Sequence, residues 1–143
     1  MKRIKTMSKV ALMMALVTAA GCCCFQKSDY SAWQGKWKGY EVGGATPGSS
    51  YLTVTGQSLD FRGADTNEWD KGFLTFLPKS NPRRADIQIT DCPEVQAIGK
   101  TCHAIYALEG GTLNIAAYAP GDPNTPMTFD AAGARHFIFK KEP

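Results

Sequence analysis

The chain has 143 residues, of which 43% are hydrophobic and 20% are charged. This length and balance suit one globular domain and exclude a disordered chain. The net charge of +3 arises at the N-terminus, because four of the 16 basic residues lie in the first nine and no acidic residue precedes Asp29. The other 12 basic residues face 13 acidic ones, so the remainder of the chain carries a charge near −1. That balance argues against a nucleic-acid partner, which would require a basic face.

The N-terminal segment has the layout of a secretory signal. Residues 1–9 are positively charged, and residues 10–20, VALMMALVTAA, are uncharged and mainly apolar. These eleven residues are fewer than the roughly 20 that a transmembrane helix needs. We therefore predict that the protein is exported.

A cysteine follows this segment directly. The small residues 19–21, Ala-Ala-Gly, precede Cys22 and resemble the bacterial lipobox, although Ala stands where Leu is favoured. The resemblance implies that residues 1–21 are a lipoprotein signal peptide and that lipid on Cys22 holds the protein at a membrane, on the periplasmic or cell-surface side. Each buried methylene of such a lipid adds about 0.8 kcal/mol. An ordinary secretory cut near residue 19 or 20 and an uncleaved N-terminal helix are the alternatives.

The rest of the chain divides into a short tether and a β-rich domain. Residues 22–32 are interpreted as the lipidated tether, and residues 33–143 as one folded domain. Short β-rich segments are separated by Gly, Pro, Asn and Asp, and several alternate apolar and polar residues, which is typical of half-buried strands. These segments are 36–42, 50–55, 58–62, 71–77, 85–90, 102–108, 112–118 and 135–140. They predict an all-β fold, an eight-stranded antiparallel up-and-down barrel, with a β-sandwich as the alternative.

An ordered set of motifs gives this domain a family resemblance. The motifs are WQGKWK, YLTVTGQSLDF, KGFLTF, ADIQIT and GKTCHAIYALEGGTLNIAAYAPGDPNTPMTF. Residues 33–142 resemble the small lipocalin-like domain of uncharacterised exported proteins that is expanded in planctomycete-type bacteria. That family commonly has Arg before the Pro at position 126, where this chain has Thr125. The resemblance implies a lipocalin-like barrel and an export signal, and it implies no particular activity.

The start of the first strand also resembles the lipocalin signature Gly-x-Trp, here Gly35 and Trp37. In that superfamily the Trp closes one barrel end and an Arg near the last strand packs across it. The resemblance therefore implies a structural pair of Trp37 and Arg135, held by a cation–π contact.

Two cysteines flank the loop PEVQAIGKT between two predicted strands. In an oxidising compartment Cys92 and Cys102 are expected to form a disulfide, which would add about 3 kcal/mol of stability for so short a loop. Free thiols are one alternative. A metal site that adds His103 and His136 is another, although these residues lack the usual ligand spacing.

Catalytic motifs are missing from the sequence. It contains no GxSxG, no HExxH and no phosphate-binding glycine loop, so we predict no enzyme, no metal and no cofactor. His103 and His136 are interpreted as surface or strand-edge residues. Glu68, Asp70 and Glu109 are interpreted as solvated turn residues.

Aromatic residues on the strands either fill the barrel or line a cavity. The first hypothesis is a binding module for a small apolar or amphipathic molecule, for which the sequence assigns no contact residues. The second is a structural or interaction lipoprotein of the cell envelope with a filled barrel, and an enzyme is the third. A cavity smaller than the roughly 300 Å³ of typical small-molecule sites would overturn the binding module.

Overall fold

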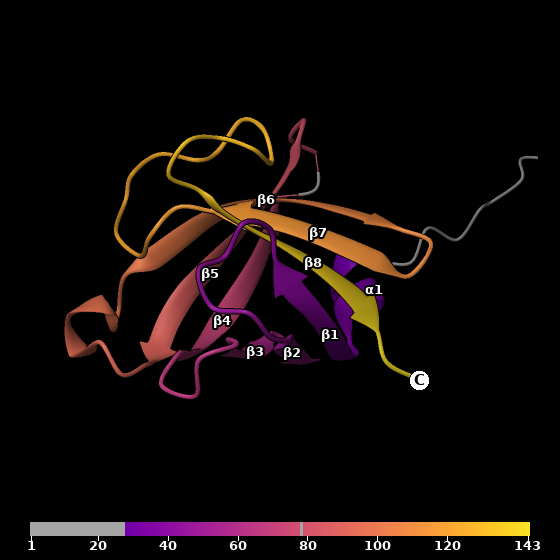
Figure 1. Ribbon diagram of the computed structural model, residues 1–143. Coiled ribbons are helices and arrows are strands. Elements are labelled where there is room, and N and C mark those ends of the chain that lie inside the picture. Colours follow the sequence, from indigo (N-terminus) through magenta and orange to yellow (C-terminus); the bar gives the residue numbers. More distant parts are fainter. Residues whose placement is uncertain (1–27, 78) are drawn as a thin grey trace, which may run out of the picture.

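A computed structural model of the chain describes residues 28–77 and 79–143 (Figure 1). Its elements are α1 (Asp29–Trp33), β1 (Gly35–Glu41), β2 (Ser50–Thr55), β3 (Ser58–Arg62), β4 (Trp69–Leu77), β5 (Arg83–Asp91), η1 (Val95–Ala97), β6 (Thr101–Glu109), β7 (Thr112–Ala117) and β8 (Arg135–Lys141). Consecutive strands pair antiparallel, and β8 pairs with β1, so the sheet closes into an eight-stranded barrel. The predicted barrel is confirmed, each strand within two residues of its expected ends, and the sandwich alternative is excluded.

Local sequence explains the strands and the closure. In β2, Leu52 and Val54 are buried while their neighbours Tyr51, Thr53 and Thr55 are not, as alternation at period two requires. Gly56, with a φ of +61°, makes the tight β2–β3 turn that a side chain would strain. A Cβ on Gly39 would lie 2.0 Å from the carbonyl oxygen of Ile138, so this glycine lets β1 approach β8 closely where the barrel closes.

The up-and-down order gives the barrel two different ends (Figure 1). The end that we call the closed end carries α1 and the short connections 56–57, 79–82 and 110–111. The end that we call the open end carries the longer loops 42–49, 63–68, 92–100 and 118–134.

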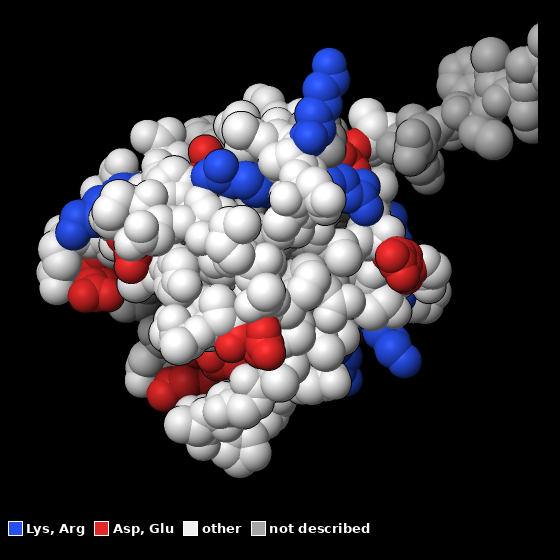
Figure 2. All heavy atoms as spheres, turned by 90° about the horizontal axis from the view of Figure 1, so that it is seen from above, with Lys and Arg blue, Asp and Glu red and all other residues white. Residues whose placement is uncertain are grey.

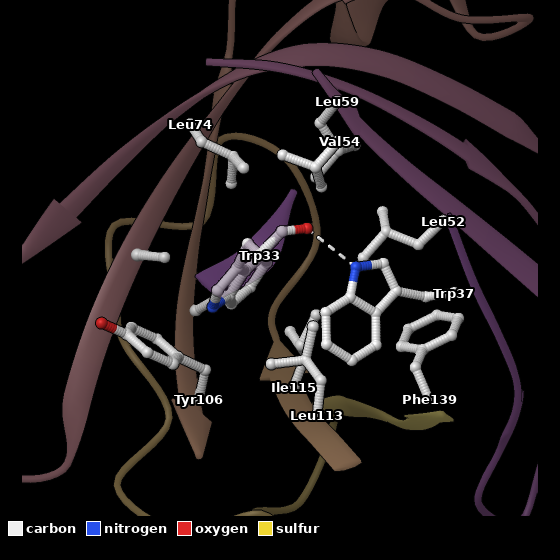
Figure 3. Packing of buried hydrophobic residues seen from close by; sticks show 12 residues of the cluster. Trp33, Trp37, Leu52, Val54, Leu59, Leu74, Tyr106, Leu113, Ile115 and Phe139 are labelled. Atoms are coloured by element: carbon white, nitrogen blue, oxygen red, sulfur yellow. Dashed lines mark hydrogen bonds between the residues drawn. The ribbon is translucent and has the colours of Figure 1, made fainter. Parts of the chain in front are cut away.

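Tightly packed aromatic side chains fill the closed end (Figure 3). Trp33, the last residue of α1, is 0% exposed and meets the rings of Phe76 and Tyr106 edge to face, with centroids 5.0 and 5.2 Å away. The indole Nε1 of Trp37 donates to the carbonyl oxygen of Trp33 at 2.8 Å. Helix α1 is therefore a plug for this end of the barrel.

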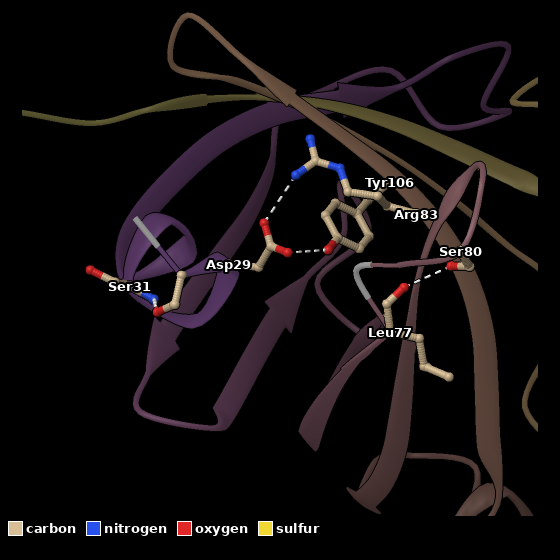
Figure 4. Close-up of polar contacts among 7 residues, drawn as sticks. Asp29, Ser31, Leu77, Ser80, Arg83 and Tyr106 are labelled. Carbon is tan, nitrogen blue, oxygen red and sulfur yellow. Dashed lines mark hydrogen bonds and ion pairs between the residues drawn. The ribbon is translucent and has the colours of Figure 1, made fainter. Parts of the chain in front are cut away.

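A polar clamp holds the plug in place (Figure 4). One carboxylate oxygen of Asp29 accepts from the Tyr106 hydroxyl at 2.8 Å, and the other lies 3.1 Å from Nη1 of Arg83. Burial, followed by the Asp29 carboxylate, raises the pKa of Tyr106. Ser28 caps the helix by accepting from the Ser31 N–H at 3.3 Å. Residues 28–32, which the sequence assigns to the tether, thus belong to the folded domain.

No helix among the described residues is long and apolar enough to cross a membrane. The predicted signal peptide, Cys22 and the first part of the predicted tether lie outside the described residues.

Candidate ligand-binding cavity

A cavity of about 130 Å³ lies inside the barrel at the open end. Strands β2 to β8 and the segment 118–120 line it, mainly with aliphatic and aromatic side chains. Phe137 meets Phe61 edge to face at 5.2 Å and stacks with Phe139 at 5.9 Å, so part of the wall is an aromatic row. The aromatic side chains of this barrel therefore divide into two groups, one that fills the closed end and one that lines the cavity.

The cavity is small for a ligand site. Its volume of about 130 Å³ is below the roughly 300 Å³ of typical small-molecule sites, which contradicts the expected binding module for any guest of ordinary ligand size. An engineered apolar cavity of about 150 Å³ nevertheless binds benzene. The volume restricts the part of a guest that lies inside this cavity to about one six-membered ring.

A carboxyl group interrupts the apolar wall. Asp70 follows the inward alternation of β4, which continues through Gly72, Leu74 and Phe76, and its side chain lines the cavity. No residue in the described part of the chain forms a hydrogen bond or an ion pair with the Asp70 carboxyl group. Burial raises its pKa first and the neighbouring Glu68 raises it further, while Arg135 lowers it. Asp70 is therefore not the solvated turn residue that the sequence suggested.

Arg135 lines the same cavity, but each of its three guanidinium nitrogens already has a carboxylate partner. Its Nε and Nη2 donate to the two carboxylate oxygens of Glu41 at 2.7 and 2.6 Å, and its Nη1 forms an ion pair with Glu68. The hydrogen bond from Arg135 is the largest cause of the lowered pKa of Glu41. A Cβ on Gly63 would lie 2.0 Å from Oε2 of Glu68, so this glycine leaves room for the carboxylate.

A second hollow adjoins Arg135 on the outer side of the open end. It measures about 350 Å³ and is lined mainly by polar residues, among them Glu41, Asp65, Glu68 and Arg135. Figure 2 shows acidic side chains gathered around a hollow on one side of the face seen from above. Because three carboxylates outnumber one guanidinium here, this part of the open end has a negative electrostatic potential.

The predicted pair of Trp37 and Arg135 is wrong. Because β8 runs antiparallel to β1, its last residue, Lys141, lies opposite Trp37, and its first residue, Arg135, lies at the other end of the barrel. The Lys141 ammonium stands 5.3 Å from the Trp37 ring centroid and donates to the Ala32 carbonyl oxygen at 3.3 Å. Trp37 is 1% exposed at the closed end, and Lys141 takes the role that the lipocalin resemblance implies for Arg135.

Cys92 and Cys102 are free thiols in the structure, where the sequence predicts a disulfide. They share one small apolar cluster with Ile89 and Ala97 near the open end, and Cys102 lines the cavity. Burial raises the pKa of Cys102 to about 12, with smaller effects of the Asp70 and Cys92 charges. Burial is also the first cause of the raised pKa of Cys92, so burial disfavours the thiolate form, the good nucleophile, at both cysteines.

The two histidines lie apart from the cavity. His103 Nδ1 is 2.7 Å from an Asp86 oxygen, and His136 Nε2 is 3.3 Å from the Asn114 amide oxygen. Burial is the first cause of the lowered pKa of His136. No group of three or more potential metal ligands occurs in the part of the chain that the structure describes, so the alternative in which these histidines join the cysteines around a metal is not assembled.

Comparisons with known proteins add no relatives. No protein-family model, no curated protein and no solved structure matches this chain. The fold is consistent with a lipocalin-like barrel, and the family resemblance stays a prediction from the sequence motifs.

Proposed function

We propose that this chain is an exported, lipid-anchored barrel that binds a small apolar or amphipathic molecule in the cavity at the open end. The observation that carries the proposal is the difference between the two ends: the closed end is packed, whereas the open end keeps an apolar cavity with the unpartnered carboxyl of Asp70. A half-buried carboxyl without a partner costs stability, and a ligand that interacts with it gives a reason for its presence.

The anchor would orient the cavity. If Cys22 carries the lipid, the six residues from there to Ser28 span at most about 20 Å. Helix α1 begins at the next residue and lies at the closed end. The closed end would then face the bilayer, and the cavity would open away from it.

A filled barrel that meets an envelope component is the second candidate. The small cavity volume favours a filled barrel over a barrel that binds a ligand of ordinary size. Apolar side chains on the open-end loops also support it, since Val95 and Met127 are each 72% exposed and Val42 and Ile98 are also exposed. In this alternative those loops would contact a protein partner and the cavity would be a packing defect.

Mass spectrometry of the protein purified from native membranes tests the anchor. We expect the wild-type mature chain to begin at Cys22 and to carry acyl groups. The variant Cys22→Ala is expected to leave the membrane fraction. The same spectra report whether the Cys92–Cys102 disulfide forms in the exported protein. An unacylated, water-soluble native product would contradict the anchor.

Cavity filling tests the binding module. Toluene is expected to bind the detergent-solubilised full chain, as followed by ligand-observed NMR, and Ala117→Phe on the cavity wall is expected to abolish that binding. The matched control, Ala132→Phe, adds the same ring at an exposed loop position and is expected to leave binding unchanged. Since overpacking can also unfold a barrel, Ala117→Leu with a melting curve provides a milder second variant. If toluene bound neither the wild type nor the control variant, the filled barrel would be favoured.

A further inference from the structure

Two charged side chains line the cavity, and their environments differ. Arg135 is held by Glu41 and Glu68 in three contacts, whereas Asp70 has no hydrogen-bond or ion-pair partner in the described part of the chain. Strand β4 aims Asp70 inward with Leu74 and Phe76, so its carboxylate faces an apolar wall. Asp70 is therefore the charged group of the wall that is free to contact a guest.

The charges around Asp70 determine which charge a guest in the cavity can carry. Glu68 and Glu94 both raise the pKa of Asp70 through their negative charges, and Arg135 is the opposing positive charge. Because Arg135 is already shared by two glutamates, the cluster of Glu41, Glu68, Asp70 and Arg135 carries a net negative charge when Asp70 is ionised. An anionic guest would be repelled, and a cationic one would be attracted.

The guest that fits this wall has a cationic donor and an apolar body. We propose that the cavity binds a small protonated organic amine, whose ammonium group is held by Asp70 and whose hydrocarbon part contacts the aromatic row of Phe61, Phe137 and Phe139. The inference rests on the proposed binding function and specifies its ligand class. An ammonium gives Asp70 a charge-assisted hydrogen bond, which is about twice as strong as a neutral one. The aromatic faces nearby add cation–π attraction.

The volume sets the size of the amine. About 130 Å³ is slightly less than the benzene-binding cavity of about 150 Å³, so one six-membered ring fills the cavity, and a single aminomethyl group would have to lie at the half-buried Asp70 carboxylate. The segment 118–120 forms part of the wall, so longer alkyl chains would have to displace it. Benzylamine therefore serves as the probe.

The experiment compares four probes of similar shape on the detergent-solubilised full chain at pH 7, with dissociation constants from ligand-observed NMR. Benzylamine is cationic, benzyl alcohol is a neutral donor, toluene has no polar group and benzoate is anionic. We expect benzylamine to bind at least tenfold more tightly than toluene, benzyl alcohol to lie between them and benzoate not to bind.

Asp70→Asn keeps the shape of the side chain and removes its charge. It is expected to weaken benzylamine binding at least tenfold and to leave toluene binding within a factor of two. The matched control is Asp91→Asn, an exposed carboxylate of the same barrel end that does not line the cavity, and it is expected to change neither. A thermal melt of each variant verifies the fold.

The outcomes separate the two levels of inference. Toluene binding with no preference for benzylamine, or with no effect of Asp70→Asn, would overturn the amine class and leave the binding module standing. Tighter binding of benzoate than of benzylamine would also overturn it, because it would identify Arg135 as the contact. Binding of none of the four probes would overturn the amine class and the binding module together.

Discussion

The two ends of this barrel are built from the same eight strands, yet one is packed with side chains and the other keeps a cavity. At the closed end the Asp29 carboxylate binds both Tyr106 and Arg83, and the Trp37 indole donates to a carbonyl oxygen, although Nε1 of Trp33 is buried there without a partner. At the open end, Asp70 faces an apolar cavity without a partner. The comparison indicates that side-chain packing is concentrated at the closed end, while the open end tolerates the stability cost of a half-buried carboxyl beside a cavity.

The largest expected effect tests the closed end. Trp33→Ala removes a fully buried ring from between Phe76 and Tyr106 and should lower the free energy of unfolding by about 3–5 kcal/mol. Urea denaturation followed by circular dichroism measures it. Trp69→Ala is the control, because Trp69 is only partly buried at the open end, and it should cost about 1 kcal/mol or less. Equal losses would show that stability is not concentrated at the closed end.

The next largest loss of unfolding free energy is expected for variants of the polar clamp on α1. Asp29→Asn weakens the contacts to Tyr106 and Arg83 and should cost about 1–3 kcal/mol of unfolding free energy, because a partly buried charged acceptor is lost. Tyr106→Phe removes only the hydroxyl contact and should cost less. Denaturant titration of both variants tests this order, and a loss in Tyr106→Phe that exceeds the loss in Asp29→Asn would contradict the clamp.

At the open end the largest effect is expected for Arg135→Met. It should cost about 1 kcal/mol at pH 7, since the ion pairs are partly exposed and their removal leaves three carboxyl groups together. Arg135 depresses the pKa of Glu41, and a carboxyl with a depressed native pKa contributes stability that is lost as pH falls through that pKa. The difference from wild type should therefore shrink below the ordinary Glu41 pKa of 4.5.

Unfolding at pH 7 and at pH 3 measures this difference. Arg62→Met is the control, because its ion pair with Asp60 is largely exposed and should contribute 0.5 kcal/mol or less. A cost of Arg135→Met that stays constant over the two pH values would argue against the Glu41 contact.

The smallest effect has the opposite sign. Asp70→Asn should raise stability at pH 7, by up to about 1 kcal/mol for a half-buried carboxyl without a partner. A carboxyl whose native pKa is raised binds its proton more tightly when folded, so stability falls as pH rises through the window between its ordinary and its native pKa. The advantage of the variant should therefore grow from pH 3 to pH 7, as melting temperatures would show, and a destabilised variant at pH 7 would indicate a structural role for Asp70.

Sequence patterns predict the barrel well and the site poorly, for physical reasons. Alternation at period two and glycine turns locate all eight strands, because both are local properties. Helix α1 has only five residues, too few to show a helical period, so the sequence pattern places its first four residues in the tether. The choice of Arg135 instead of Lys141 as the partner of Trp37 failed because it depends on the direction of β8 relative to β1.

Asp70 carried a signal that the prediction did not use. It lies two residues before Gly72 and four before Leu74, in phase with the inward face of β4, but the predicted strand began one residue after it. Extending the alternation backward would have placed a carboxyl inside the barrel. Its lack of a partner depends on distant elements, the β3–β4 loop and β8, and no local pattern contains that information.

A benzylamine titration of the isotope-labelled full chain in detergent micelles, observed through amide and indole NMR signals, tests binding at the open end most directly. We predict chemical-shift changes centred on Asp70, Cys102 and Phe137 at the open end, with the indole signals of Trp33 and Trp37 at the closed end unchanged. Saturation without any shift at the open end, or shifts centred on the closed end, would contradict it.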